Sequence, residues 1–366
     1  MLADTQLVIF GGHRYGGDGV FEYFNDVHVL VRCAQLPLSA LQATRDSPVR
    51  PAPWTYGHRT DPCVLCYPEL NFALQDVETS TWHDVRCAGD APPPRYGHSA
   101  TLVGRRMFIF GGRSHGGQLL NDMYVLDLDE WCWVRVIPTT ASPSVRFEHA
   151  ACAIGARIVI FGGWNGEVCY NDLWVFDAGS FTWMRPKTNG RPPSPRHGCR
   201  MELLADGRLV TFGGHSTVDK EKDTPAVYNG DLCVLDVQTM VWTRPRALGD
   251  DFPSGRTGHS LCRVGDTIVV VGGWAGIRRS MVFEYLPVPD NFAERDISLL
   301  KGYIFMLDGS KMEWKAPPAA NTDNPHRYGH TTTVVGDYLF LWGGWDGNRP
   351  LNDLQVLDLS PLALSG

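Results

Sequence analysis

Six Gly-Gly pairs recur along the chain, and each follows a short run of apolar residues. The pairs lie at 11–12, 111–112, 162–163, 213–214, 272–273 and 343–344. The runs before them, such as Ile158-Val159-Ile160-Phe161, are rich in β-branched and aromatic residues and have the length of a buried strand. A chain of 366 residues has room for two or three unrelated domains, but a strand repeated in register predicts one repetitive all-β domain.

Three further landmarks keep a regular distance from these pairs. Arg-x-x-His precedes four of the strands, with its His 13 residues before the first Gly, at Arg95/His98, Arg146/His149, Arg256/His259 and Arg327/His330. A fifth copy, Arg196/Cys199, has Cys in the place of His. Asp-x5-Trp follows at Asp76/Trp82, Asp127/Trp133, Asp177/Trp183, Asp236/Trp242 and Asp308/Trp314, and Asn-Asp pairs at 25–26, 121–122, 171–172 and 352–353 open the preceding strand. A unit of about 50 residues with these landmarks predicts a four-stranded antiparallel meander of strands a, b, c and d.

The order Arg-x-Gly-His, apolar-Gly-Gly, Asn-Asp and Asp-x5-Trp resembles the kelch repeat, and the resemblance covers nearly the whole chain. It implies an all-β, six-bladed kelch-type β-propeller with four-stranded antiparallel blades, in one domain over 1–360 with a short tail at 361–366. The blades are expected at about 5–87, 95–137, 146–186, 196–245, 256–316 and 327–359.

The two end blades depart from the repeat. Blade one begins at its b strand, and blade six stops after 354–358, with Leu364 where its Trp is expected. The end blades are therefore expected to be incomplete and to meet at an exposed strand edge, either because the chain is a fragment or because poorly patterned segments close the ring. Within blade one, 25–30 and 70–76 both fit strand c. An insertion over 31–69 is favoured, and a degenerate seventh repeat stays open as the alternative.

Composition narrows the class of protein. Forty acidic residues against 33 Lys and Arg give a net charge of −7, which argues against a general nucleic-acid or anionic-membrane binder. No apolar run is long enough for a membrane span, and the first residues do not resemble a signal peptide. The ten Cys are scattered along the chain and are interpreted as reduced thiols. A cytoplasmic protein without membrane insertion is predicted.

Residues that recur once per blade are interpreted as structural, and residues unique to one blade as candidates for recognition. The recurring His are expected to be buried and hydrogen bonded rather than catalytic, and the recurring Trp to pack between blades. Cys63-x-x-Cys66, with His58 and Cys33 nearby, is only half of a zinc site. Other kelch-like propellers include metal enzymes, but Leu30 occupies the metal-binding position of the partial motif formed with Glu22 and Asp26. No catalytic residue, metal or cofactor is therefore predicted.

Antiparallel order places the b–c and d–a loops on one face of the ring, and the long insertions are all b–c loops. Loops on a rigid scaffold concentrate recognition residues, and aromatic and Arg side chains dominate interface hot spots. The candidate binding residues that follow the Gly-Gly pairs on this face are Arg14, Arg113, His115, Trp164, His215, Trp274, Arg278, Arg279, Trp345 and Arg349. Such a surface suits an acidic peptide or a free C-terminus, unless the arginines, including those of the d–a junctions, pair with acidic residues of neighbouring blades.

The resemblance implies a non-enzymatic scaffold or adaptor that binds a protein or peptide on this face. Kelch propellers also serve as small-GTPase effectors and as substrate receptors of ubiquitin ligases, and the second role is kept as an alternative. A metal-dependent enzyme of the kelch-like class is the remaining one.

Overall fold

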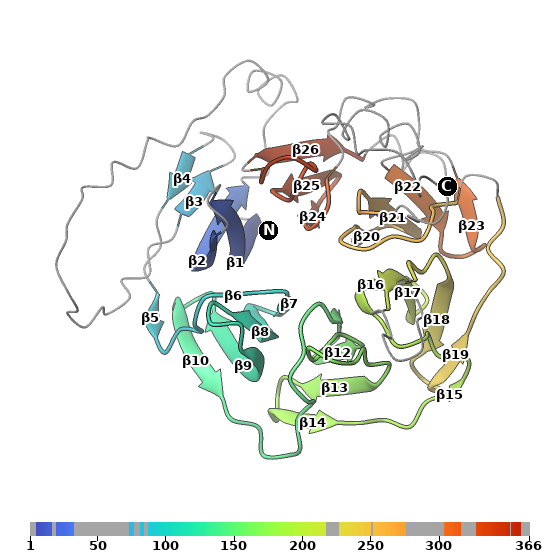
Figure 1. Cartoon of the computed structure of the whole chain (residues 1–366), viewed down its shortest axis with the longest axis horizontal. Helices are drawn as coiled ribbons and strands as arrows, with labels where there is room; N and C mark the ends of the chain where they lie inside the picture. Colours follow the sequence, from blue (N-terminus) through green and yellow to red (C-terminus); the bar gives the residue numbers. More distant parts are fainter. Residues whose placement is uncertain are drawn as a thin grey trace, which may run out of the picture.

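The computed structural model describes residues 5–16, 20–32, 73–76, 81–83, 87–216, 227–249, 252–275, 304–315, 327–351 and 353–359. Their strands form six sheets that follow one another around a central axis (Figure 1). The prediction of an all-β propeller is confirmed. No helix occurs within these ranges, so none there has the length and apolar character needed to cross a membrane.

Four of the sheets contain strands a, b, c and d in the predicted order, a fifth contains a, b and c, and blade three is typical. Its strands β11 (Ala150–Ile154), β12 (Arg157–Phe161), β13 (Leu173–Asp177) and β14 (Thr182–Met184) pair antiparallel in sequence order. The corresponding strands of blade two are β7 (Ser99–Val103), β8 (Arg106–Ser114), β9 (Leu119–Asp127) and β10 (Cys132–Val136), and those of blade four are β16 (His197–Leu203), β17 (Arg208–His215), β18 (Leu232–Asp236) and β19 (Val241–Thr243). Blade five has β20 (Ser260–Val264), β21 (Thr267–Val271), β22 (Ile304–Asp308) and β23 (Glu313–Lys315). Blade six has β24 (Thr331–Val335), β25 (Tyr338–Trp342) and β26 (Leu354–Asp358). The last sheet has three strands among the described residues.

The first sheet departs from the regular blade, so the described residues contain five kelch-type blades rather than the six that the sequence predicts. Its strands are β1 (Thr5–Gly16), β2 (Val20–Arg32), β3 (Ala73–Asp76) and β4 (Thr81–His83), and β2 pairs parallel with β3. Both candidates for strand c therefore lie side by side in one sheet. Val31 is aligned with Asp76, so β3 supplies the Asp that β2 lacks five residues after Asp26. The segment 33–72, and with it the question of a seventh repeat, lies outside the described residues.

Three of the five recurring Trp side chains, Trp183, Trp242 and Trp314, join neighbouring blades as predicted. Trp183 of blade three packs on Phe110 of blade two, with ring centroids 4.9 Å apart. The same contact recurs between Trp242 and Phe161 at 5.4 Å and between Trp314 and Phe212 at 5.6 Å. Each Phe lies in a b strand, immediately before Gly-Gly. The hydrophobic core is therefore a series of interfaces between consecutive sheets.

The recurring His side chains lie in the same interfaces. His149 Nε2 is 2.8 Å from Ser99 Oγ of the preceding blade, and His330 Nε2 is 3.1 Å from Ser260 Oγ, which confirms the structural interpretation for these two. A Cβ on Gly111 would lie 2.8 Å from Arg146 O and 3.2 Å from the His149 ring, and a Cβ on Gly213 would clash with the His259 ring, so the first Gly of the pair leaves room for the histidine. In blade four the buried Cys199 replaces His, and the position facing it holds the buried Ala150 instead of Ser.

Each d strand is an edge strand, and in the described blades the linker that precedes the blade covers this edge. β5 (Ala88–Gly89) pairs parallel with β10, β15 (Asn189–Gly190) pairs parallel with β19, and Leu248 bridges to Glu313. We call these linker residues the straps. In blade three the side chain of Thr140 covers the edge of β14 instead, since its Oγ1 accepts from Trp183 N at 2.7 Å and donates to Trp183 O at 3.1 Å.

Candidate binding face

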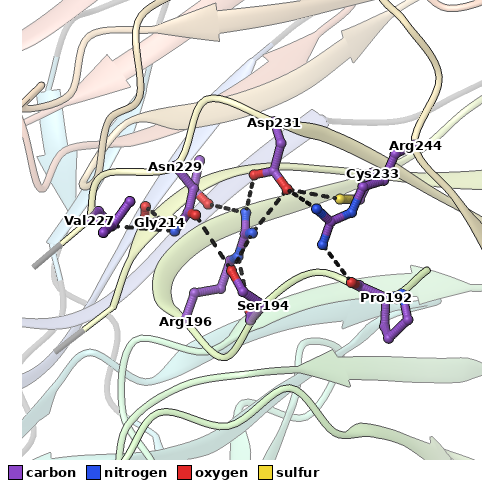
Figure 2. Close-up of polar contacts among 10 residues, drawn as sticks. Pro192, Ser194, Arg196, Gly214, Val227, Asn229, Asp231, Cys233 and Arg244 are labelled. Carbon is purple, nitrogen blue, oxygen red and sulfur yellow. Dashed lines mark hydrogen bonds and ion pairs between the residues drawn. The ribbon is translucent and has the colours of Figure 1, made fainter. Parts of the chain in front are cut away.

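The arginines of the d–a junctions are buried inside their own blades. Arg196 binds both carboxylate oxygens of Asp231, at 2.7 and 3.1 Å, and donates to Gly213 O at 3.1 Å (Figure 2). The same bidentate pair joins Arg95 to Asp122, Arg146 to Asp172, and Arg327 to Asp353. All four arginines are at most 1% exposed. They hold the b–c loop to the d–a junction, and their partners belong to the same blade rather than to its neighbours.

Arg256 differs because Tyr303 occupies the sequence position of the paired Asp, five residues before Asp308. Its Nη1 donates to Gly272 O at 2.8 Å and its Nη2 to Ser254 Oγ at 3.2 Å. The guanidinium also lies 4.5 Å from the centre of the Phe305 ring. Burial lowers the pKa of Arg256 to about 10. In this blade hydrogen bonds and an aromatic ring therefore surround the cation.

Five cross-strand pairs form the rim around the axis on the b–c/d–a face. In each pair, the residue after the junction Arg lies opposite the residue after Gly-Gly. The pairs are Tyr96/Arg113, Phe147/Trp164, His197/His215, Thr257/Trp274 and Tyr328/Trp345. We call these ten residues the aromatic belt. They include five of the ten residues selected from the sequence, which the structure brings together on one rim.

Aromatic contacts link the belt into a nearly continuous row across blades two to four. Phe147 contacts Tyr96 at 5.9 Å and Trp164 at 5.3 Å between ring centroids. The Trp164 ring stacks on His197 at 5.9 Å. The two rings of His197 and His215 are 3.9 Å apart, and His215 in turn stacks on Tyr228 at 5.3 Å. A second contact joins Trp274 and Tyr328 at 5.8 Å.

Two exposed valines extend this apolar surface. Val168 is 53% exposed and Val227 is 50% exposed. Val168 precedes Cys169, which bridges to Trp164, and Val227 precedes Tyr228. Phe147 and His197 are buried, whereas Trp164, His215 and Tyr228 are half-buried. This part of the belt therefore combines packed rings with exposed aliphatic side chains on the adjoining loops.

The arginines selected from the sequence have different environments. Arg113 is half-buried and donates from Nε to Gly117 O at 3.1 Å and from Nη1 to Tyr96 Oη at 3.3 Å. Arg349 is 79% exposed and lies 3.6 Å from the Asp346 carboxylate. His115 is exposed on the loop beyond β8. For Arg14, in β1, only the backbone is described, and it lies opposite Glu22 of β2. Arg278 and Arg279 lie outside the described residues.

Glu148 is a residue of this face that sequence reasoning missed. It occupies the position held by Gly97, Gly198, Gly258 and Gly329 in other blades, and it has the same left-handed backbone, with φ of 54°. Its N–H donates to Gly97 O at 2.7 Å, and its carbonyl accepts from Gly198 N at 2.8 Å. These bonds link blades two, three and four around the axis. The departure from glycine is visible in the sequence and is the signal that points to this residue.

The Glu148 side chain reaches into blade four. Its Oε2 is 2.7 Å from Nδ1 of His197, and about a third of the side chain is exposed. Burial opposes ionisation of Glu148, but the hydrogen bond and charge of His197 outweigh it and lower the pKa of the carboxyl. Burial, together with the charge of His197, lowers the pKa of His215 to about 4, so this ring is neutral at pH 7. The centre of the belt thus carries one carboxylate among stacked rings.

Metal chemistry has no support in the described ranges, where no three His, Cys, Asp or Glu side chains are placed to hold an ion. Cys33, His58, Cys63 and Cys66 lie outside those ranges. The seven described cysteines are free thiols. Burial raises the pKa of Cys152 and Cys262 to about 12, and a thiol with so high a pKa is a poor nucleophile at neutral pH.

Sheets arranged around an axis, Gly-Gly pairs that admit the buried His, and an inter-blade Trp define a kelch-type β-propeller. The chain belongs to the family described as the KLHDC2/KLHL20/DRC7 Kelch-repeats domain, whose model matches residues 63–273, and a Kelch motif also matches residues 326–360. It is similar to acyl-CoA-binding domain-containing protein 4 of Arabidopsis thaliana, at 31% identity over 297 residues that cover 78% of this chain and 40% of the relative.

The chain is also similar to two animal proteins, at comparable identity but over different shares of their length. Host cell factor of Drosophila melanogaster is 27% identical over 310 residues, which cover 77% of this chain and 19% of the relative. The Rab9 effector protein with kelch motifs of Xenopus laevis is 31% identical over 207 residues, 54% of each chain. The chain spans less than half the length of the first two relatives.

Proposed function

We propose that this protein is a non-enzymatic protein-interaction module that binds an extended peptide or a protein surface on the aromatic belt. The observation that carries the proposal is the row of contacting rings from Tyr96 to Tyr228 on the loop face of a rigid scaffold. Phe147 and His197 are buried, and the half-buried rings of the row would supply contact area at small entropic cost. Val168 and Val227 add exposed apolar side chains on the adjoining loops. The kelch propellers among the relatives support a role in protein interaction.

An acidic partner remains part of the proposal, in a more limited form than the sequence predicted. The d–a arginines already bind carboxylates of their own blades, so they do not contribute to it. The side chains that would pair with acidic residues of the partner are Arg349 and Arg113. Arg349 is exposed, with the Asp346 carboxylate 3.6 Å away, and Arg113 lies at the edge of the belt.

Two finer expectations are also proposed here. We infer that the sheet β1–β4 is blade one and brings the number of blades to six, since its β3 and β4 carry the Asp76/Trp82 landmark in the usual antiparallel pairing. We also propose a cytoplasmic location, which the free thiols of the described cysteines support.

The test compares proteins captured by the wild-type chain with those captured by Trp164→Ala and by the control Ile137→Ser. Ile137 is 81% exposed and follows the outer strand β10, so the control also changes an exposed apolar residue. Partners that bind the belt are lost with Trp164→Ala and kept with Ile137→Ser. Equal capture by all three proteins, at equal folded concentration, would place recognition elsewhere.

A further inference from the structure

The linker between blades three and four displays a serine beside two arginines. Ser194 is exposed, while Pro193 before it is buried and Pro195 after it is exposed. Arg196 Nη2 donates to Ser194 Oγ at 2.8 Å (Figure 2). The hydroxyl lies 3.5 Å from Asn229 Oδ1, a long contact. Ser194 is therefore an exposed residue whose hydroxyl already faces a guanidinium.

The second arginine, Arg244, comes from the residue after β19 and lies on the other side of Asp231. Its Nη2 donates to Pro192 O at 2.8 Å, and its Nη1 is 3.6 Å from Asp231 Oδ2 (Figure 2). The Arg244 side chain is 41% exposed, so it is held less firmly than the buried Arg196. Because Asp231 is already bound in bidentate fashion by Arg196, Arg244 has spare donors for another anion.

The segment around Ser194 is an irregular linker fixed at both ends, in which Ser194 and Pro195 are exposed. Arg191 N donates to Trp242 O at 2.9 Å and Arg196 N donates to Tyr170 O at 3.0 Å, so both ends of the segment are fixed. Three of the four residues between them are proline, which has no N–H and favours an extended backbone. Ser194-Pro195 is the dipeptide that proline-directed serine/threonine kinases modify.

We propose that Ser194 is a phosphorylation site whose phosphate is held by Arg196 and Arg244. A proline-directed kinase with MgATP supplies the phosphoryl group: the Oγ–P bond forms, the bond between the β- and γ-phosphates breaks, ADP leaves, and the hydroxyl proton passes to the kinase. The product replaces a hydroxyl acceptor with a group of charge about −2. Charge-assisted bonds from two guanidinium groups then offset the repulsion by Asp231.

The same position in other blades lacks one part of this arrangement. Ser254 Oγ also accepts from its arginine, Arg256, at 3.2 Å, but Gly255 follows it. Ser144 also precedes its arginine by two residues, but Val145 follows it. Ser142-Pro143 is the other Ser-Pro within the described ranges, and Ser142 is only partly exposed. Among the described linkers, blade four therefore combines the serine, the proline and the second arginine.

The first test is incubation of the folded full chain with MgATP and a cyclin-dependent kinase, followed by mapping of the phosphate by mass spectrometry. Because Ser47, Ser142, Thr224 and Ser360 also precede proline, the readout is the phosphate on the peptide that contains Ser194. We expect this phosphate in the wild type and in the matched control Ser254→Ala, and its absence in Ser194→Ala. A kinase that modifies a peptide of residues 190–197 but leaves Ser194 of the folded chain unmodified would overturn the proposal, as would modification at Ser142 alone.

The second test measures how the phosphate is held, by a ³¹P NMR titration of the modified protein. A free phosphoserine loses its second proton at a pKa of about 6. Contact with Arg244 stabilises the dianion, so we expect this pKa to be lower by about one unit in the wild type than in Arg244→Gln. Identical titrations in the two proteins would show that Arg244 does not bind the phosphate and would refute that part of the proposal.

Discussion

Replacing the strap residue Gly190 with Ala should destabilise blade four more than an ordinary glycine substitution does. Gly190 has φ of 83°, and a Cβ there would clash with the carbonyl oxygen of Trp242. The strap would have to move off β19. It would then lose the bonds from Asn189 N to Met240 O and from Arg191 N to Trp242 O, both 2.9 Å.

The expected magnitude follows from two contributions. A left-handed backbone costs a residue with a Cβ roughly 1–2 kcal/mol. Two backbone hydrogen bonds contribute about 0.5–1.5 kcal/mol each. Gly207 provides the matched control, because its φ is 87° and a Cβ there meets nothing within 4 Å. Gly207→Ala therefore keeps only the first contribution, and Gly190→Ala should be less stable than Gly207→Ala by about 1–3 kcal/mol.

The measurement is urea unfolding followed by tryptophan fluorescence, with Trp242 itself beneath the strap. A lower urea midpoint is expected for Gly190→Ala than for Gly207→Ala. Blade three offers an independent check, because Thr140→Val removes the hydroxyl that covers Trp183 while Thr140→Ser keeps it. Equal midpoints for the two glycine variants, or equal midpoints for Thr140→Val and Thr140→Ser, would refute the role assigned to the straps.

Three further results are expected. If the partner is acidic, Arg113→Ala/Arg349→Ala should weaken its binding by about 1.5–3 kcal/mol in calorimetry, and binding to the wild type should fall with added salt; full, salt-insensitive binding would exclude an acidic partner at these residues. Because the pKa of His215 in the folded protein, about 4, lies below the unfolded value of about 6.5, its neutral form stabilises the fold above pH 6.5, and that stability is lost as pH falls toward 4. The urea midpoint of His215→Phe should therefore decline less between pH 7 and pH 5 than that of the wild type, and parallel declines would contradict this assignment. Glu148→Ala and Glu148→Gly both remove the contact with His197, but only Ala retains the strain of a left-handed backbone. Urea unfolding should therefore show Glu148→Gly to be more stable than Glu148→Ala by about 1 kcal/mol. The reverse order would show that position 148 is unstrained.

Landmarks that recur once per blade were enough to predict the propeller, because each one satisfies a local geometric need. Gly-Gly admits a histidine, and Trp183 fills the space beside Phe110. The position of the belt also followed from the sequence, since strand alternation fixes which loops share a face. These are consequences of short-range pattern, which a single sequence records well.

Side-chain partners distant in sequence were harder to predict. Arg196 and Asp231 lie 35 residues apart, and nothing in the spacing distinguishes an arginine that binds its own blade from one that faces solvent. The strand order of the first sheet could not be predicted for a similar reason. Its parallel pair β2–β3 joins two strands that a long segment separates in the sequence. The strap had a weak signal, glycine seven residues after Trp at 89, 190 and 249, which is hidden at 140 by Thr.

The straps also change where the repeating unit begins. Residues 88–89 enter the sheet of blade two before its inner strand is made, and they are joined at the end of the blade by β10. One structural unit thus begins with a strap and ends with the d strand that pairs with this strap. A cut between a d strand and the next strap therefore leaves both units intact. A break between Gly89 and β7 would separate a unit from its own outer edge. New chain ends or inserted domains are therefore best placed at about 137 or 244–247, ahead of a strap. During synthesis, a strap emerges from the ribosome directly after the preceding blade, and it remains unpaired until the d strand of its own blade has been synthesised.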